Sequence, residues 1–166
     1  MVNHPDLYSA QQFFSRCPLY VCFDDVLMVP HYSDVESRKS LSTANNLGNI
    51  KLGLPVISSP MDTVTELEMA SAMYTNGGLG IIHRYNSIEE QAKIVKDSQS
   101  GEAIVGAAIG VTGDYQERAK ELVNSGAQVL CVDVAHGHHS MMRDALKHLK
   151  EEYGGDTHIM AGNVAT

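Results

Sequence analysis

The chain of 166 residues has few cationic side chains and few cysteines. Twelve Lys and Arg stand against twenty Asp and Glu, which gives a formal net charge of −8. Without a basic stripe, long-range attraction to nucleic acid or to an anionic membrane surface is disfavoured. Cys17, Cys22 and Cys131 are odd in number and lack metal-ligand spacing, which favours a reducing compartment over a disulfide scaffold. We therefore expect a cytoplasmic protein with neither nucleic-acid nor membrane partners.

Long apolar runs are also absent from the sequence. The longest uncharged apolar runs fall well short of the roughly 18–20 residues that a membrane-spanning helix needs. Residues 1–10 carry His4, Pro5 and Asp6 where a signal peptide would have a basic and then an apolar stretch. Hydrophobic residues make up 43% and charged residues 19%, a globular composition that argues against a disordered chain. The expectation is a soluble, folded protein.

Short apolar runs recur along the chain after Leu54. They lack alternation of polar and apolar residues, which is typical of strands buried on both faces of a parallel sheet. Helical patterns separate them, and residues 65–68 and 87–90 both fit a capping box at a helix start. The expected strands are residues 55–59, 79–83, 104–109, 129–134 and 158–161.

This alternation of strands and helices leaves two α/β architectures open. One is an open doubly wound sheet, and the other is part of a (β/α)8 TIM barrel. The repeat alone does not decide between them. Residues 1–30 include several aromatic side chains and a short apolar stretch, and residues 32–49 are mainly polar. We expect residues 1–50 to form an arm that packs on a domain beginning near Lys51. No flexible linker divides residues 51–166, so we expect one domain there.

Polar and small residues gather at the expected carboxyl ends of the strands. Ligands bind at this edge in both architectures, which makes these segments the candidate site. They are residues 58–62, 83–85, 110–113, 133–139 and 162–166.

Histidines are the most conspicuous candidates for chemistry. His83, His136 and His138 could join Asp133 around a zinc ion. However, Gly137 suggests a turn that aims the two neighbouring histidines apart. We therefore expect histidines that contact solvent or ligand, and no metal site.

Nucleophile and phosphate-loop signals are weak. Cys131 lies within an expected strand, where a buried thiol behaves as a small hydrophobe. No Gly-x-Ser-x-Gly elbow occurs, and the glycines at 106, 110 and 113 are not followed by the lysine of a P-loop.

Motifs at the strand ends carry a resemblance to a known family. In chain order they are residues 23–30, 58–66, 77–83, 133–138 and 162–166. Together they resemble the N-terminal half of an IMP dehydrogenase, within the IMP dehydrogenase/GMP reductase family. The resemblance selects the TIM barrel, of which residues 51–166 would supply about the first five parallel strands. It also implies that the regulatory CBS modules are absent, because residues 96–103 form only a short connection.

The implied activity is the NAD-dependent oxidation of IMP to XMP through a covalent adduct on a cysteine. Asn163 matches an asparagine near both substrate and nicotinamide, and Asp133 matches the residue that bonds the cofactor ribose. The substrate-binding positions implied are Ser59, Met61 and Asn163. The cofactor-binding positions implied are Asp133, Val134, Ala135 and Gly162.

Other parts of the family's machinery have no counterpart in these residues. The catalytic-cysteine loop, the main phosphate loops, the potassium ligands and the mobile flap belong to the C-terminal half. We therefore expect no catalytic residue in this chain, and potassium binding and a homotetramer only for a full-length enzyme. Half a barrel leaves an unpaired strand edge, so we expect the chain alone to aggregate or to lack a cooperative melt.

Two alternatives to the dehydrogenase stay open. GMP reductase would convert GMP to IMP with NADPH, and Ser37-Arg38 leans towards reductase sequences. Thr65-Glu66 and the Ala-His-Gly-His run at 135–138 instead favour the dehydrogenase. The second alternative is a non-catalytic part of such an enzyme.

Overall fold

The computed structural model describes residues 22–99 and 103–164. The chain divides into two compact units, residues 1–41 and 42–166. Described parts of the first unit include the short 3-10 helices η1 (Phe23–Asp25) and η2 (Arg38–Ser40), and the segment between them is exposed. Residues 42–50 belong to the second unit, and the packing of the expected arm on the barrel stays a prediction.

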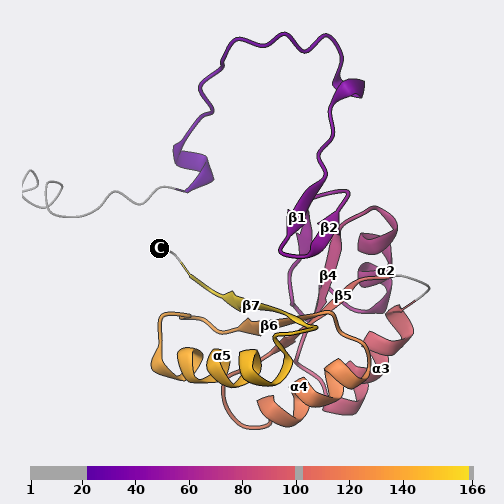
Figure 1. The fold of residues 1–166 in the computed structure, drawn as a ribbon, viewed down its shortest axis with the longest axis vertical. Helices are drawn as coiled ribbons and strands as arrows, with labels where there is room; N and C mark the ends of the chain where they lie inside the picture. Colours follow the sequence, from indigo (N-terminus) through magenta and orange to yellow (C-terminus); the bar gives the residue numbers. More distant parts are fainter. Residues whose placement is uncertain (1–21, 100–102, 165–166) are drawn as a thin grey trace, which may run out of the picture. The chain divides into compact units, whose positions relative to one another are not determined.

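A parallel sheet forms the centre of the second unit (Figure 1). Its strands are β3 (Ile57–Ser58), β4 (Leu79–Ile82), β5 (Val105–Ile109), β6 (Val129–Asp133) and β7 (His158–Gly162). All five expected strands are confirmed, with ends that shift by one or two residues. Helices α2 (Leu67–Thr75), α3 (Ile88–Ser98), α4 (Tyr115–Asn124) and α5 (Ser140–Tyr153) connect them.

The order of the strands separates the two architectures. In the described residues the spatial order is β3-β4-β5-β6-β7, so each new strand joins the edge that the previous strand left free. A doubly wound sheet reverses its strand order at a switch point, and no reversal occurs among these strands. Sequential winding with the helices on one side is the geometry of a (β/α)8 barrel.

Each face of the sheet has its own apolar cluster. Alternate strand residues, such as Ala107 and Leu130, pack with buried residues of all four helices. The intervening residues, such as Ala108 and Val129, pack with the antiparallel hairpin of β1 (Asn45–Leu47) and β2 (Ile50–Leu52). Because both faces are covered, the central strands are apolar throughout, which explains why their sequence shows no alternation.

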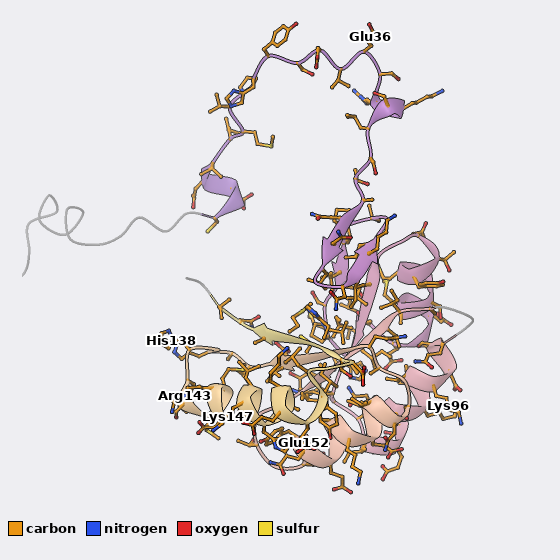
Figure 2. All side chains as sticks on the ribbon, in the orientation of Figure 1. Glu36, Lys96, His138, Arg143, Lys147 and Glu152 are labelled. Carbon is orange, nitrogen blue, oxygen red and sulfur yellow. The ribbon has the colours of Figure 1, made fainter. Side chains whose placement is uncertain are left out.

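Helix α5 shows how the outer layer is held. Met142, Ala145 and Leu149 are buried against the sheet at helical spacing. Figure 2 shows Arg143 and Lys147 on the side of α5 that points away from the sheet, and both are exposed. None of the helices in the described ranges is long and apolar enough to cross a bilayer.

One of the two expected capping boxes is confirmed and the other is wrong. Ser87 Oγ accepts a hydrogen bond from the Glu90 amide at 3.1 Å, and the Glu90 carboxylate accepts one from the Ser87 amide at 3.1 Å. At α2, however, the N-cap is Glu66, without a side-chain capping bond. Thr65 cannot cap this helix because its hydroxyl is bonded to the loop after β3.

Candidate functional site

A cavity of about 430 Å³ opens at the carboxyl ends of the strands. Four of the residues implied by the resemblance line it, at the carboxyl ends of three different strands: Ser59, Met61, Asp133 and Asn163. Pro60, Asp62 and Tyr85 complete its lining. The fold therefore brings together side chains that are up to about a hundred positions apart in the sequence, because parallel strands end at the same edge.

Backbone pairing between β6 and β7 places Asp133 beside Asn163. Asp133 is opposite Gly162 in the strand register, and the Val134 amide donates to the Gly162 carbonyl at 2.9 Å. Beyond the strand, the Asn163 amide donates to the Val134 carbonyl at 2.7 Å. The ladder thus continues past both strand ends, and it holds a carboxylate and a carboxamide next to each other at the cavity.

The other implied cofactor residues lie around this cavity in different ways. Ala135 lines an adjoining cavity of about 610 Å³, which shares Asn163 with the first. Val134 packs against the helix-side core. Gly162 contributes its carbonyl to the pairing with Val134. Of these three residues, only Ala135 has a place on a cavity wall.

Thr65 supports the wall of the cavity, a role that the sequence analysis missed. Its side chain is buried, and its hydroxyl donates to the Ser59 carbonyl at 2.6 Å and lies 2.9 Å from Ser58 Oγ. These contacts tie the loop after β3 to the start of α2. A hydroxyl followed by Glu three residues later matches a helix cap, so local sequence pointed to the wrong partner for this side chain.

The histidines do not converge on one point. His83 is buried, and its Nε2 lies 3.0 Å from Glu66 Oε1. His136 and His138 stack on each other instead, with ring centroids 6.4 Å apart. Among residues 22–99 and 103–164, no three His, Cys, Asp or Glu side chains are grouped as metal ligands.

Cys131 is poorly suited to act as a nucleophile. Its side chain is buried in the inner face of the sheet. Burial, reinforced by the nearby charge of Asp133, raises the pKa of the Cys131 thiol to about 11. The thiolate is the nucleophilic form, so this thiol is unreactive at neutral pH. Cys22 is exposed in the first unit, and Cys17 lies outside the described residues.

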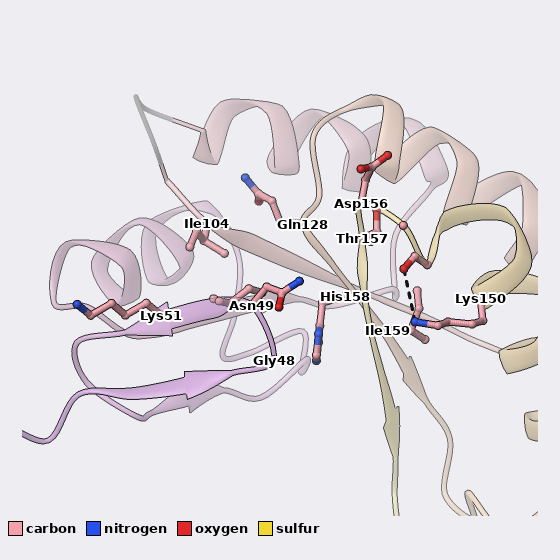
Figure 3. A pocket seen from close by; sticks show the side chains of 13 residues that line it. Gly48, Asn49, Lys51, Ile104, Gln128, Lys150, Asp156, Thr157, His158 and Ile159 are labelled. Atoms are coloured by element: carbon pink, nitrogen blue, oxygen red, sulfur yellow. Dashed lines mark hydrogen bonds between the residues drawn. The ribbon is translucent and has the colours of Figure 1, made fainter.

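A further cavity of about 510 Å³ lies at the opposite, amino end of the strands (Figure 3). In Figure 3, His158 stands between the hairpin turn at Gly48 and Lys150 of α5. Gly48 has a φ of +57°, and a Cβ there would come within 2.7 Å of the His158 ring. The hairpin therefore needs glycine to approach β7 closely. Because ligands of such barrels bind at the carboxyl ends of the strands, this amino-end cavity is not part of the candidate site.

Fold and site together define the first part of an α/β barrel with a ligand cavity at the carboxyl ends of its strands. A sequence model described as the IMP dehydrogenase / GMP reductase domain matches residues 20–166. The chain belongs to the IMP dehydrogenase/GMP reductase family.

Solved and characterised relatives agree with this assignment. The crystal structure of inosine 5′-monophosphate dehydrogenase from Legionella pneumophila is 42% identical, with a TM-score of 0.81 over 89% of this chain and 45% of that chain. Inosine-5′-monophosphate dehydrogenase of Cryptosporidium parvum is 35% identical and aligns with 87% of this chain and 46% of its own length. A GMP reductase of Streptococcus agalactiae serotype V is 29% identical over 92% of this chain and 46% of its own length.

Two predictions are confirmed by these matches. The sheet is the first part of a (β/α)8 barrel, and the chain corresponds to the N-terminal half of a family member. The chain spans about half the length of the relatives that it matches. Both enzyme names occur among them, so membership of an oxidoreductase family is shown and the particular reaction is not.

Proposed function

We propose that this chain supplies the nucleotide- and cofactor-binding half of an IMP dehydrogenase, which oxidises IMP to XMP with NAD and water. One observation carries the proposal: Ser59, Met61, Asp133 and Asn163 line a single cavity at the carboxyl ends of the strands. The likeness to the Legionella dehydrogenase, at 42% identity, supports the dehydrogenase reaction over the GMP reductase reaction.

The chemistry of these side chains fits a nucleoside ligand. Asp133 is partly buried at the cavity wall, and its carboxylate accepts hydrogen bonds only, as the two hydroxyls of a ribose require. Asn163 offers both a donor and an acceptor. Met61 is 52% exposed and presents a polarizable thioether that can lie against a purine ring. NAD, when bound, would supply the hydride acceptor.

In this proposal the chain binds and orients, and it does not provide the nucleophile. Cys131 is buried and protonated, so the covalent adduct requires a cysteine from the C-terminal half. The main phosphate contacts, the potassium ion and the assembly into a homotetramer are likewise expected of the full-length enzyme, and they stay predictions.

The test is complementation of the barrel. The chain is mixed with the C-terminal half of the Legionella dehydrogenase, IMP and NAD, and NADH is followed by its absorbance. We expect XMP and NADH only when both halves are present. Asp133→Asn should raise the KM for NAD about 10- to 150-fold, since a hydrogen bond to a charged group contributes roughly 1.5–3 kcal/mol. Asp144→Asn, on the exposed side of α5, is the matched control and should leave KM unchanged.

GMP reductase is the second candidate, favoured by the Streptococcus agalactiae reductase that aligns with 92% of this chain. It predicts consumption of NADPH with GMP and formation of IMP by the same assembled barrel. NADPH consumption without any NADH formation from IMP would overturn the dehydrogenase proposal in favour of the reductase.

A further inference from the structure

Two buried side chains, Thr65 and His83, connect three segments at one side of the cavity. Thr65 is fully buried and His83 is 3% exposed. Thr65 precedes α2, and His83 follows β4. The His83 amide also donates to the Thr65 carbonyl at 3.4 Å. Buried polar groups of this kind are kept only where their hydrogen bonds are satisfied, so their partners show what they hold in place.

Thr65 holds the turn after β3. Its hydroxyl donates to the Ser59 carbonyl at 2.6 Å, and its amide donates to the Met61 carbonyl at 3.0 Å. Within the turn, the Met61 amide donates to the Ser59 carbonyl at 2.8 Å. Both Ser59 and Met61 line the cavity, so the conformation of this wall depends on Thr65.

His83 makes hydrogen bonds through both ring nitrogens. The Tyr85 amide donates to His83 Nδ1 at 3.1 Å, which requires Nδ1 to be unprotonated. The proton is therefore on Nε2, which donates to Glu66 Oε1 at 3.0 Å. The rings of His83 and Tyr85 are stacked, with centroids 6.2 Å apart and planes at 22°. Tyr85 lines the cavity, and Glu66 is the N-cap of α2 next to Thr65.

We propose that His83 is a positioning residue, which uses its two nitrogens to hold Tyr85 and the turn at residues 58–62 at a fixed spacing in the wall of the nucleotide cavity. This positioning role rests on the proposed function, because the proposed function is what assigns the cavity to a nucleotide. His83 does not line the cavity itself and acts through Tyr85 and through Glu66. Its loss should weaken binding of the nucleotide and leave the chemical step largely unchanged.

Two substitutions separate the two hydrogen bonds. In His83→Asn the side-chain oxygen can replace Nδ1 and keep the Tyr85 amide bonded, whereas in His83→Gln the amide nitrogen can replace Nε2 and keep the bond to Glu66. Each variant and the matched control His148→Asn, on α5, is assembled with the C-terminal half of the Legionella dehydrogenase. A neutral hydrogen bond contributes about 1 kcal/mol net, so we expect His83→Gln to raise the KM for IMP about fivefold. We expect kcat to stay within about twofold in both variants, because no reacting atom is touched.

Amide hydrogen exchange supplies a readout that needs no turnover. Exchange at Tyr85 should accelerate in His83→Gln and stay slow in His83→Asn, while exchange in the first turn of α2 should show the opposite pattern. His148→Asn should change neither. Unchanged Tyr85 exchange in His83→Gln would overturn the proposal even if neither reaction were observed. A fall in kcat at constant KM, or equal losses in all three variants, would also overturn it.

Discussion

The central strand β5 and the edge strand β7 have the same length and very different surroundings. All five residues of β5 (Val105–Ile109) are buried. All five residues of β7 (His158–Gly162) are only half-buried. Both strands carry mainly small and apolar residues, so composition does not account for the difference. β5 has a strand on each side and clusters on both faces, whereas within residues 22–99 and 103–164 β7 is paired with β6 alone.

This contrast shows which strands of the sheet are fully buried by their neighbours within this chain. At the centre, cross-strand neighbours and helices remove nearly all side-chain surface from water, which stabilises a strand by about 25 cal/mol per Å² of apolar surface. At the edge, Ile159 and Met160 pack only partly against the two clusters. The other edge is similar, since Ile57 in β3 is 38% exposed. Additional strands would be needed to bury both edges as well as the centre is buried.

The largest expected effect is association through the edges. Because unpaired strand edges recruit further strands, we expect the chain alone to form oligomers that grow with concentration. Light scattering at increasing concentration measures this, and adding the C-terminal half of the Legionella dehydrogenase should suppress it. A monomer with a sharp cooperative melt would contradict this view of the edges.

The next largest effect is a difference in stability between two residues that face each other across the β6–β7 pair. Leu130 and Ile159 are partners in the register, but only Leu130 is fully buried. We expect Leu130→Ala to lower the free energy of unfolding by about 2–5 kcal/mol and Ile159→Ala by roughly half as much. Urea unfolding at a concentration below the onset of association measures both. Equal losses would show that the edge is as well packed as the centre.

A smaller effect concerns Cys131 and high pH. Its pKa is raised to about 11 in the folded protein, whereas an exposed cysteine titrates near 8.5. The unfolded chain therefore loses this proton first as pH rises. The neutral thiol therefore contributes to the free energy of unfolding in full below about pH 8.5. This contribution decreases by about 1–3 kcal/mol as the pH rises towards 11. Urea unfolding across this range measures how the free energy of unfolding changes with pH. We expect a smaller decrease with pH in Cys131→Ala. The same slope in both proteins would refute burial of the thiol.

The smallest effect is expected at the carboxyl edge of the sheet. Met61 is 52% exposed at the cavity, so Met61→Ala should change the free energy of unfolding by less than about 0.5 kcal/mol. It should nevertheless weaken IMP binding by the assembled barrel, which titration calorimetry measures. A loss of stability as large as that of Leu130→Ala would mean that the cavity wall belongs to the core.

Much of this fold could be predicted because its signals are local. The apolar run at 129–134 marks β6, and Ser87 with Glu90 marks the start of α3, since a strand and a capping box each depend on a few consecutive residues. Asp133 and Asn163 could be chosen as site residues because they lie at the carboxyl ends of two parallel strands. Their binding roles rest on resemblance and stay predictions.

Other features depend on which segments meet. Thr65 has the local pattern of a helix cap, but its hydroxyl is bonded to the loop after β3, a partner supplied by tertiary packing. His83 presents the same difficulty, because nothing near it in sequence predicts the contact of Nε2 with Glu66, seventeen positions earlier. Side-chain hydrogen bonds of this kind have little local periodicity to reveal them.

The sequence by itself determined the strands, the start of α3 and the motifs that mark the family, because these are encoded in short segments. Tertiary structure alone decided the sequential strand order, the shared cavity and the partners of Thr65 and His83. Tertiary structure also decided that β5 is fully buried and that β7 is only half-buried. The physical reason is that burial and polar satisfaction are properties of neighbours in space, and those neighbours are set by how the whole sheet winds.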